Sequence, residues 1–252
     1  MDRANLAGEL ARRLRAARRL TILTGAGVSA ASGVPTFRGA DGLWRSFRPE
    51  ELATPGAFAR DPALVWEWYA WRRETIGRCA PNPAHQVIAQ WSKRAGTTVV
   101  TQNVDDLHLA AGTSNLVRLH GSIWELSCWA QCAPGQHAWR DERVPLAEVP
   151  PRCPHCGAHA RPAVVWFGEP LREQDLRAAF AATSCDVLLT VGTSSVVHPA
   201  AGLVDEARRR GAFTAEINPE VTPASQVVDM AIQGRAELVL PELERLRTPF
   251  AS

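Results

Sequence analysis

The chain has 252 residues and a mass of 27.4 kDa, which is enough for one large domain or two small ones. Hydrophobic residues make up 46% and charged residues 21%, which excludes general disorder, collagen and low-complexity polymers. The net charge of +2 gives no strong attraction to nucleic acid or to a membrane surface, and we expect neither as a partner. No segment approaches the ~18 consecutive apolar residues of a membrane span.

Residues 1–19 are rich in arginine and alanine, as a transit peptide would be, but they contain acidic residues and no serine. Leu6, Leu10 and Leu14 recur at helical spacing, and the segment leads directly into an apolar run. We therefore expect the first helix of the folded domain and a cytoplasmic protein.

Short apolar runs then alternate with helical patterns, which predicts an α/β fold with a parallel sheet. Strands are expected at 20–24, 97–102, 185–192 and 213–218, with a weaker candidate at 238–240. Helices are expected over 66–72, 84–91, 173–182 and 200–210.

Two stretches interrupt this alternation. Residues 31–83 are predicted to form a loop followed by a helical insertion, and residues 122–162, which lack strong strands, to form a small inserted module. The remaining parts are expected to form one Rossmann-like sheet domain from residues 1–30, 84–121 and 163–252.

Four of the six cysteines form two close pairs inside the second insertion, Cys128/Cys132 and Cys153/Cys156. Close pairs at this separation are typical of one tetrahedral zinc ion, and a closed four-sulfur site is structural rather than catalytic. Buried or disulfide-bonded cysteines are the alternative, and a cytosolic protein disfavours disulfides. The first pair has three intervening residues, so a histidine could replace Cys132 as ligand. The histidines nearby are His137, His155 and His159.

Glycines directly follow the first expected strand, at Gly25 and Gly27. Glycines at such a turn let a diphosphate approach backbone N–H groups. The ordinary dinucleotide fingerprint has a third glycine three residues later and an acidic residue about 20 positions on. Here the third glycine comes late, at Gly33, and the acidic residue is missing. A nucleotide ligand is therefore predicted and a dehydrogenase is not, with a tight turn that binds nothing as the alternative.

This loop and several later segments resemble the motifs of the sirtuins, the NAD-dependent protein deacylases. The segments occur in the order of that family over nearly the whole chain, and the cysteines fall where the family has its zinc. The matching segments are 25–30 with 33–39, 101–108, 119–122, 164–169 and 191–195.

The resemblance implies NAD as co-substrate, bound across the edge of the sheet. It implies diphosphate and cofactor-loop contacts from Gly25, Ala26, Gly27, Ser29, Thr36, Phe37, Arg38 and Trp44. It implies a ribose and nicotinamide pocket made by Gln102, Asn103, Val104 and Asp105. It implies an adenosine side made by Gly192, Thr193, Ser194, Asn218, Pro219, Glu220 and Ala236.

The resemblance also implies the reaction. The carbonyl oxygen of an acyl-lysine attacks C1′ of the nicotinamide ribose as nicotinamide leaves, and His120 then acts as general base on a ribose hydroxyl. The products are lysine, nicotinamide and O-acyl-ADP-ribose. Histidine suits this role because its unperturbed pKa lies near neutrality. Considered without the motif, a single histidine such as His120 is more often a hydrogen-bonded histidine of the core.

Tyr69 and Arg72 lie three residues apart in an expected helix and therefore share a face, where a phenol and a guanidinium could together hold a carboxylate. An interfacial tyrosine beside a solvated arginine is the alternative. The segment resembles the class III sirtuins, which act on succinyl- and malonyl-lysine, and Ala53 is implied to leave room for the longer acyl chain. A strand is also expected at 164–168 and is implied to pair with the peptide, through Val164, Val165, Trp166, Phe167 and Gly168.

The expected partners are acylated-lysine protein substrates, and the expected state is a monomer. Protein mono-ADP-ribosyl transfer is the alternative activity on the same fold. A zinc-ribbon adaptor without turnover is a second alternative, which the mixed charges around the cysteines disfavour.

Overall fold

A six-stranded parallel sheet carries the larger part of the chain. The computed structural model describes residues 3–36 and 49–247. The strands follow the order β3-β2-β1-β7-β8-β9, and every ladder between them is parallel. Their bounds are β1 (Leu20–Thr24), β2 (Thr97–Thr101), β3 (Leu116–Arg118), β7 (Val187–Val191), β8 (Phe213–Asn218) and β9 (Met230–Gln233). This arrangement confirms the predicted α/β class.

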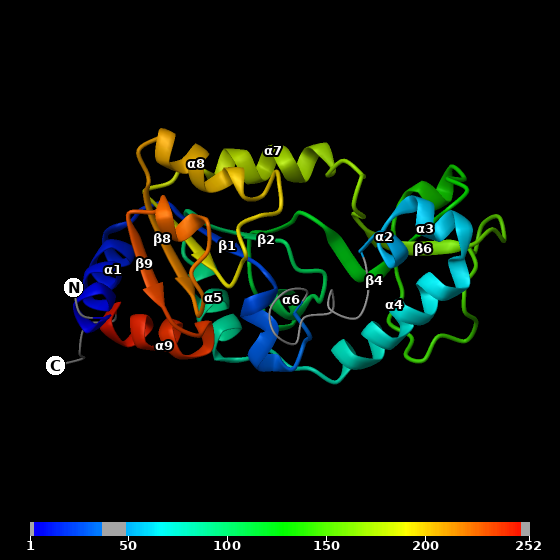
Figure 1. Cartoon of the computed structure of the whole chain (residues 1–252), viewed down its shortest axis with the longest axis horizontal. Helices are drawn as coiled ribbons and strands as arrows, with labels where there is room; N and C mark the ends of the chain where they lie inside the picture. The colour runs from blue at the N-terminus through cyan, green and yellow to red at the C-terminus, as the bar shows by residue number, and fades with distance from the viewer. Residues whose placement is uncertain (1–2, 37–48, 248–252) are drawn as a thin grey trace.

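Helices cover both faces of this sheet (Figure 1). One face packs against α1 (Arg3–Ala16), α5 (Pro83–Ser92) and α9 (Ala236–Arg247), and the other against α7 (Glu173–Ala182) and α8 (Gly202–Arg209). Successive side chains of a strand point to opposite faces, so Ile22 lies in the first core and Leu23 in the second. A sheet buried on both faces needs the continuous apolar runs from which its strands were predicted.

A second group of elements gathers at the other end of the molecule in Figure 1. It contains α2 (Pro49–Leu52), α3 (Pro55–Arg60), α4 (Pro62–Gly77) and an antiparallel sheet in the order β5-β4-β6. These strands are β4 (Gly121–Cys128), β5 (Trp139–Arg140) and β6 (Ala160–Val164). Phe58 and Trp66 from the helices share one apolar core with Ile123 and Leu126 from the sheet. The two predicted insertions therefore pack on each other.

Helix α4 has clear start signals in the sequence. The Asp61 carboxylate caps the helix by accepting the N–H of Leu64 at 2.9 Å, and Pro62 occupies the first helical position. The short elements that remain are α6 (Leu107–Ala110) and the 3-10 helices η1 (Ala26–Ser32), η3 (Pro134–Gln136) and η4 (Ala224–Gln226).

Three expectations about strands were wrong. Residues 238–240 lie inside α9, where Val239 and Leu240 belong to the buried face of the helix. An apolar run of only three residues does not distinguish a strand from a helix. The second insertion does contain strands, including the eight-residue β4. The strand expected around 164–168 ends at Val164.

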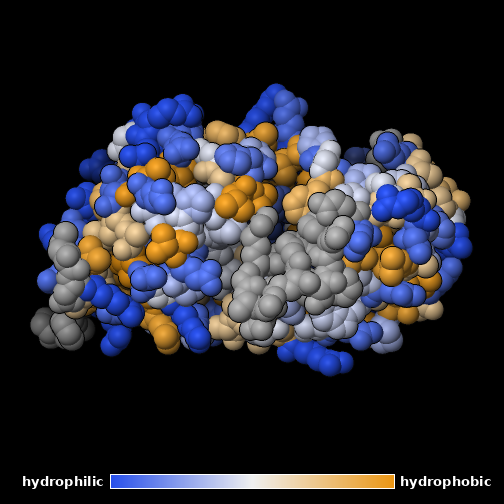
Figure 2. Space-filling view, viewed as in Figure 1, coloured by the Kyte–Doolittle hydropathy of each residue, from blue (hydrophilic) through white to orange (hydrophobic). Residues whose placement is uncertain are grey.

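Figure 2 shows hydrophilic residues over much of one face, with apolar residues in small separate groups. The large apolar residues are concentrated instead in the three buried cores. Within residues 3–36 and 49–247, no helix combines the length and the apolar composition needed to cross a bilayer.

Candidate active site

Gly25 and Gly27 lie at the carboxyl end of β1, against the end of β7. The N–H of Gly27 donates to the carbonyl of Gly192 at 2.8 Å. A Cβ at Gly27 would lie 2.8 Å from that carbonyl oxygen, and one at Gly25 would lie 2.7 Å from Cβ of Thr193. Glycine is therefore required here by the approach of the neighbouring strand, a reason that the sequence motif alone did not reveal.

The ends of β2, β7 and β8 meet at Thr193. Gln102 Nε2 donates to the Thr193 hydroxyl at 2.9 Å, and Asn218 Nδ2 donates to the Thr193 carbonyl at 2.8 Å. Residues predicted for the nicotinamide side and for the adenosine side thus converge at one sheet edge, which is where open α/β sheets bind ligands.

A buried polar cluster lies beside this edge. The Ser29 hydroxyl donates to Asp105 Oδ2 at 2.7 Å and accepts from Asn103 Nδ2 at 3.2 Å. His85 Nδ1 accepts the N–H of Asn82, which leaves its Nε2–H to donate to the Ser29 hydroxyl at 3.3 Å. Burial raises the pKa of Asp105. Sequence reasoning missed His85, which lies outside the quoted motifs.

His120 is half-buried in the connection between β3 and β4. Its Nδ1 lies 2.8 Å from the carbonyl oxygen of Gln102. A carbonyl only accepts, so Nδ1 carries the proton and Nε2 is the atom that can take one up. Burial lowers the pKa of His120, while the hydrogen bond to Gln102 acts in the opposite direction. The ring is therefore neutral at pH 7, and the backbone carbonyl of Gln102, the residue after β2, orients it.

The four paired cysteines converge on one point. Their sulfur atoms all lie within 4.8 Å of one another, with Cys128–Cys156 at 3.5 Å and Cys132–Cys153 at 3.7 Å. Four thiolates around one zinc ion at about 2.3 Å would be separated by about 3.8 Å, so the cluster fits this metal. None of the four forms a disulfide. Cys132 lies in the cluster, and none of the nearby histidines does.

Tyr69 and Arg72 lie on one face of α4 and are both buried, with exposed fractions of 2% and 6%. The Arg72 guanidinium lies 4.8 Å from the ring of Trp68 and 5.6 Å from that of Tyr69. Arg72 also lines a small cavity between α4 and Val34. The alternative of a solvated arginine is therefore wrong.

The segment 164–168 runs from the end of β6 into a turn at Phe167 and Gly168, and it lies beside Ala53. The N–H of Phe167 donates to the Ala53 carbonyl at 2.9 Å, and the N–H of Val165 donates to the His120 carbonyl at 3.0 Å. The segment therefore joins the vicinity of His120 to that of Ala53. Its side chains alternate, with Trp166 buried and Phe167 exposed.

The model of the Sir2 family matches residues 25–199. NAD-dependent protein deacylase 2 of Pyrobaculum aerophilum is 51% identical over 242 residues, which cover 93% of this chain and 95% of that protein. The chain belongs to the Sir2 family. This sirtuin is also 51% identical over 246 residues to NAD-dependent protein deacylase 1 of Pseudomonas aeruginosa, covering 94% and 97% of the two chains.

Solved structures agree with the family. A mutant Sir2 homologue in complex with ADP-ribose matches this sirtuin with a TM-score of 0.90 and 44% identity over 95% of each chain. The predicted Rossmann-like fold with an inserted zinc-binding module is confirmed. The use of NAD is likewise confirmed.

The predicted roles of the other NAD-site residues stay predictions, and some of these residues lie outside the described ranges. Ala236 packs its side chain into the core beneath the sheet. Pro219 and Glu220 are exposed after β8. Phe37, Arg38 and Trp44 lie outside the described residues. The remaining ones, half-buried or on the loops already described, are Ala26, Thr36, Val104 and Ser194.

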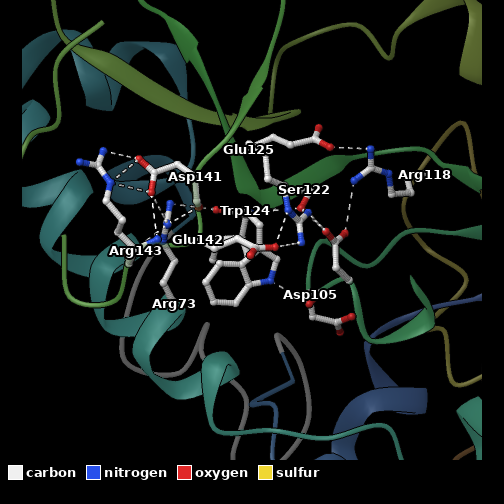
Figure 3. Close-up of polar contacts among 12 residues, drawn as sticks. Arg73, Asp105, Arg118, Ser122, Trp124, Glu125, Asp141, Glu142 and Arg143 are labelled. Atoms are coloured by element: carbon white, nitrogen blue, oxygen red, sulfur yellow. Dashed lines mark hydrogen bonds and ion pairs between the residues drawn. The ribbon is translucent and has the colours of Figure 1, made fainter. Parts of the chain in front are cut away.

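Sequence reasoning also missed a charged network behind the site (Figure 3). The buried carboxylate of Asp106, next to Asp105, accepts from the Ser122 hydroxyl at 2.9 Å and from Arg118 at 3.3 Å, and also pairs with Arg140 of β5. Arg118 pairs in addition with Glu125 at 2.7 Å. The network ties the Asn103–Asp106 loop to the zinc-bearing sheet.

A second contact ties α4 to the same sheet. Arg73 is buried and donates to Asp141 Oδ1 at 3.3 Å and to the carbonyl of Ile123 at 3.4 Å. Asp141 also accepts from Arg143, as Figure 3 shows. Because Arg73 follows Arg72, this contact helps to fix the helix that carries Tyr69 and Arg72.

Zinc removal is expected to unfold the cysteine module, because metal binding and folding are coupled in such sites. Freshly purified protein should contain one zinc per chain by elemental analysis. Cys153→Ser should lower the metal content and the unfolding temperature, whereas Cys185→Ser, in a buried thiol outside the cluster, should leave the metal content unchanged. Zinc-free protein with full activity would contradict the structural role.

Acid is expected to destabilise this sirtuin through two buried histidines. Burial lowers the pKa of His85 to about 4 and that of His108 to about 3. Both are neutral in the folded state and take up protons in the unfolded state near pH 6.5. Stability is therefore complete above pH 6.5 and falls as the pH drops toward 4, by about 1.4 kcal/mol per pH unit for each histidine. Urea unfolding at pH 7.5, 6 and 5 measures this, and His85→Asn should make the dependence shallower.

Proposed function

We propose that this sirtuin removes acidic acyl groups, such as succinyl and malonyl, from lysine side chains of proteins, besides acetyl groups. The activity class, NAD-dependent protein deacylation, is confirmed by the family and by the named relatives. Protein ADP-ribosyl transfer is not favoured. The acyl preference is our proposal, and the buried pair of Tyr69 and Arg72 carries it.

The buried guanidinium of Arg72 supports an acidic acyl group. A charged group out of water is costly unless an opposite charge or hydrogen bonds compensate it. Burial lowers the pKa of Arg72, while the nearby Tyr69 and Asp105 raise it. A carboxylate at the end of the acyl chain would add a compensating charge directly at the guanidinium, which can bind it with two parallel hydrogen bonds. An acetyl group offers no such charge.

The roles of the remaining residues follow from their positions. NAD, when bound, supplies the ribose carbon that accepts the acyl oxygen and releases nicotinamide. His120 Nε2 takes the proton from a ribose hydroxyl, with its ring held by the carbonyl of Gln102. Gly25, Gly27 and Thr193 shape the sheet edge under the diphosphate and ribose. The small side chain of Ala53, beside Phe167, leaves room for the longer acyl chain.

Activity is expected to fall in acid because His120 must be neutral to accept a proton. Burial lowers its pKa below the usual 6.5, so kcat/KM should be constant above pH 7 and should fall only below pH 6.5. The pH profile of nicotinamide release, at saturating NAD and at peptide concentrations well below KM, measures this. An acid limb centred above pH 7 would contradict the assignment.

The cellular setting remains a proposal. None of the six cysteines forms a disulfide, which fits a reducing compartment such as the cytoplasm. The monomeric state and the lack of nucleic-acid and membrane partners stay predictions.

The deciding experiment incubates the protein with NAD and three peptides of one sequence that carry acetyl-, malonyl- or succinyl-lysine. Nicotinamide release gives kcat/KM for each. The proposal requires turnover of the acidic peptides at least comparable to that of the acetyl peptide. Turnover of acetyl-lysine alone would refute the acidic-acyl preference and leave the deacylase class standing.

A further inference from the structure

The hydroxyl of Tyr69 is bound by a residue 97 positions away. Trp166 Nε1–H donates to the Tyr69 oxygen at 2.9 Å, and both side chains are 2% exposed. An indole N–H only donates, so the phenolic oxygen accepts at this bond. The hydrogen of Tyr69 must then point away from Trp166. Among the charged groups near the phenol, the guanidinium groups of Arg72 and Arg161 have no acceptor atom. The carboxylate of Glu169 already accepts from Arg161 and from the backbone N–H of Trp166.

We propose that Trp166 is a positioning residue for acyl selectivity, because its indole N–H fixes the Tyr69 hydroxyl so that its hydrogen is offered to the carboxylate of the acyl group. This inference rests on the proposed acidic-acyl function and adds a residue to it. Tyr69 and Arg72 touch the acyl group, whereas Trp166 acts through Tyr69.

The indole is itself held rigidly. The Arg161 guanidinium lies 3.5 Å from the centre of its ring, and Phe58 packs against it with ring centroids 5.4 Å apart. The carboxylate of Glu169 accepts from Arg161 and from the backbone N–H of Trp166, each at 2.8 Å. A donor fixed in this way fixes the rotation of the hydroxyl it binds.

Tyr69 also remains a donor over the working pH range. Burial raises the pKa of its phenol above the usual 10, so the hydroxyl keeps its hydrogen at neutral pH. Trp166 directly precedes Phe167, whose N–H donates to the Ala53 carbonyl. Trp166 thus connects the segment expected to bind the peptide with Tyr69, which is proposed to contact the carboxylate of the acyl group.

The test measures the ratio of kcat/KM for succinyl- and acetyl-lysine peptides of one sequence. Trp166→Phe removes the N–H and keeps an aromatic ring, and should lower this ratio about three- to tenfold, as expected for one neutral hydrogen bond. Losses in peptide docking affect both peptides and cancel in the ratio. In a Tyr69→Phe background, the same substitution should lower the ratio no further, because the hydroxyl is already gone.

Trp66→Phe is the matched control. Trp66 is equally buried and packs near Tyr69, but its indole N–H donates to the carbonyl of Ala160 at 2.7 Å. It should lower the unfolding temperature like Trp166→Phe and leave the ratio unchanged. An equal fall of the ratio in both variants, or in both Tyr69 backgrounds, would overturn the role of Trp166.

Two further readouts make every outcome decisive. If Arg72→Met leaves the ratio unchanged, the acidic-acyl function fails and this inference fails with it. If Arg72→Met and Tyr69→Phe lower the ratio but Trp166→Phe does not, only this inference fails. Should Trp166→Phe not fold, the indole resonance of Trp166 in the wild-type chain labelled with 15N-tryptophan should shift further with a succinyl-lysine peptide than with an acetyl-lysine peptide of the same sequence. The same shift with both peptides would overturn the inference.

Discussion

Replacing His120 by alanine is expected to abolish deacylation while NAD continues to bind. A positioned general base contributes about 10²- to 10⁴-fold to a rate, so the rate of deacylation should fall by at least about a hundredfold. The His120 ring hydrogen-bonds to the backbone carbonyl of Gln102 and to none of the residues predicted for the adenosine side. Loss of the imidazole therefore removes the base without removing contacts to the adenosine half.

NAD binding and folding are the controls for this variant. The dissociation constant for NAD, measured by calorimetry, should change little, and so should the unfolding temperature, because the half-buried ring makes one side-chain hydrogen bond, to Gln102. A variant that loses NAD binding in parallel with activity would show a structural role instead. Near-wild-type turnover would exclude His120 as the base.

Local patterns in the sequence predict the parts of the site that lie close together along the chain. The strand β1 and its glycines follow from one apolar run and the turn after it. The zinc cluster follows from the spacing of two cysteine pairs. Tyr69 and Arg72 follow from helical spacing, since residues three apart share a face whatever the helix packs on.

Contacts between distant segments lie beyond such reasoning. Arg73 meets Asp141 across 68 residues, and Trp166 meets Tyr69 across 97. Nothing local distinguishes these side chains from other arginines and tryptophans of the chain. The edge strand β3 was missed for a similar reason, because its three half-buried residues give no apolar run. Its pairing with β2 is decided by the sheet and not by its own residues.

The glycines after β1 have two separate structural explanations, and the sequence suggested only one of them. They were assigned to the approach of a diphosphate, yet a Cβ at Gly27 would already collide with the backbone of Gly192 in the protein alone. Close approach of two strand ends and access for a ligand both require the same residue type. The sequence cannot separate them because it does not show which strands become neighbours.

Replacing Arg72 by methionine is expected to reduce desuccinylation far more than deacetylation. A succinyl group brings a negative charge into the buried face of α4, where Arg72 is 6% exposed. Losing one charge-assisted contact there should cost roughly 1.5–3 kcal/mol, or about one to two orders of magnitude in kcat/KM. Methionine keeps most of the volume and removes a buried charge, so the helix should stay folded.

The contrast between two substrates and two arginines makes this result specific. The acetyl group makes no contact with the guanidinium, so its kcat/KM should change little. Arg78→Met removes a positive charge from the exposed end of the same helix and should change kcat/KM for neither substrate.

Tyr69→Phe should act in the same direction as Arg72→Met but less strongly, because it removes one neutral donor. The double variant should lose less than the sum of the two, since both side chains hold one carboxylate. Equal losses of kcat/KM on both peptides would make Arg72 a structural residue, and the acyl preference would then have to come from other side chains near the acyl group.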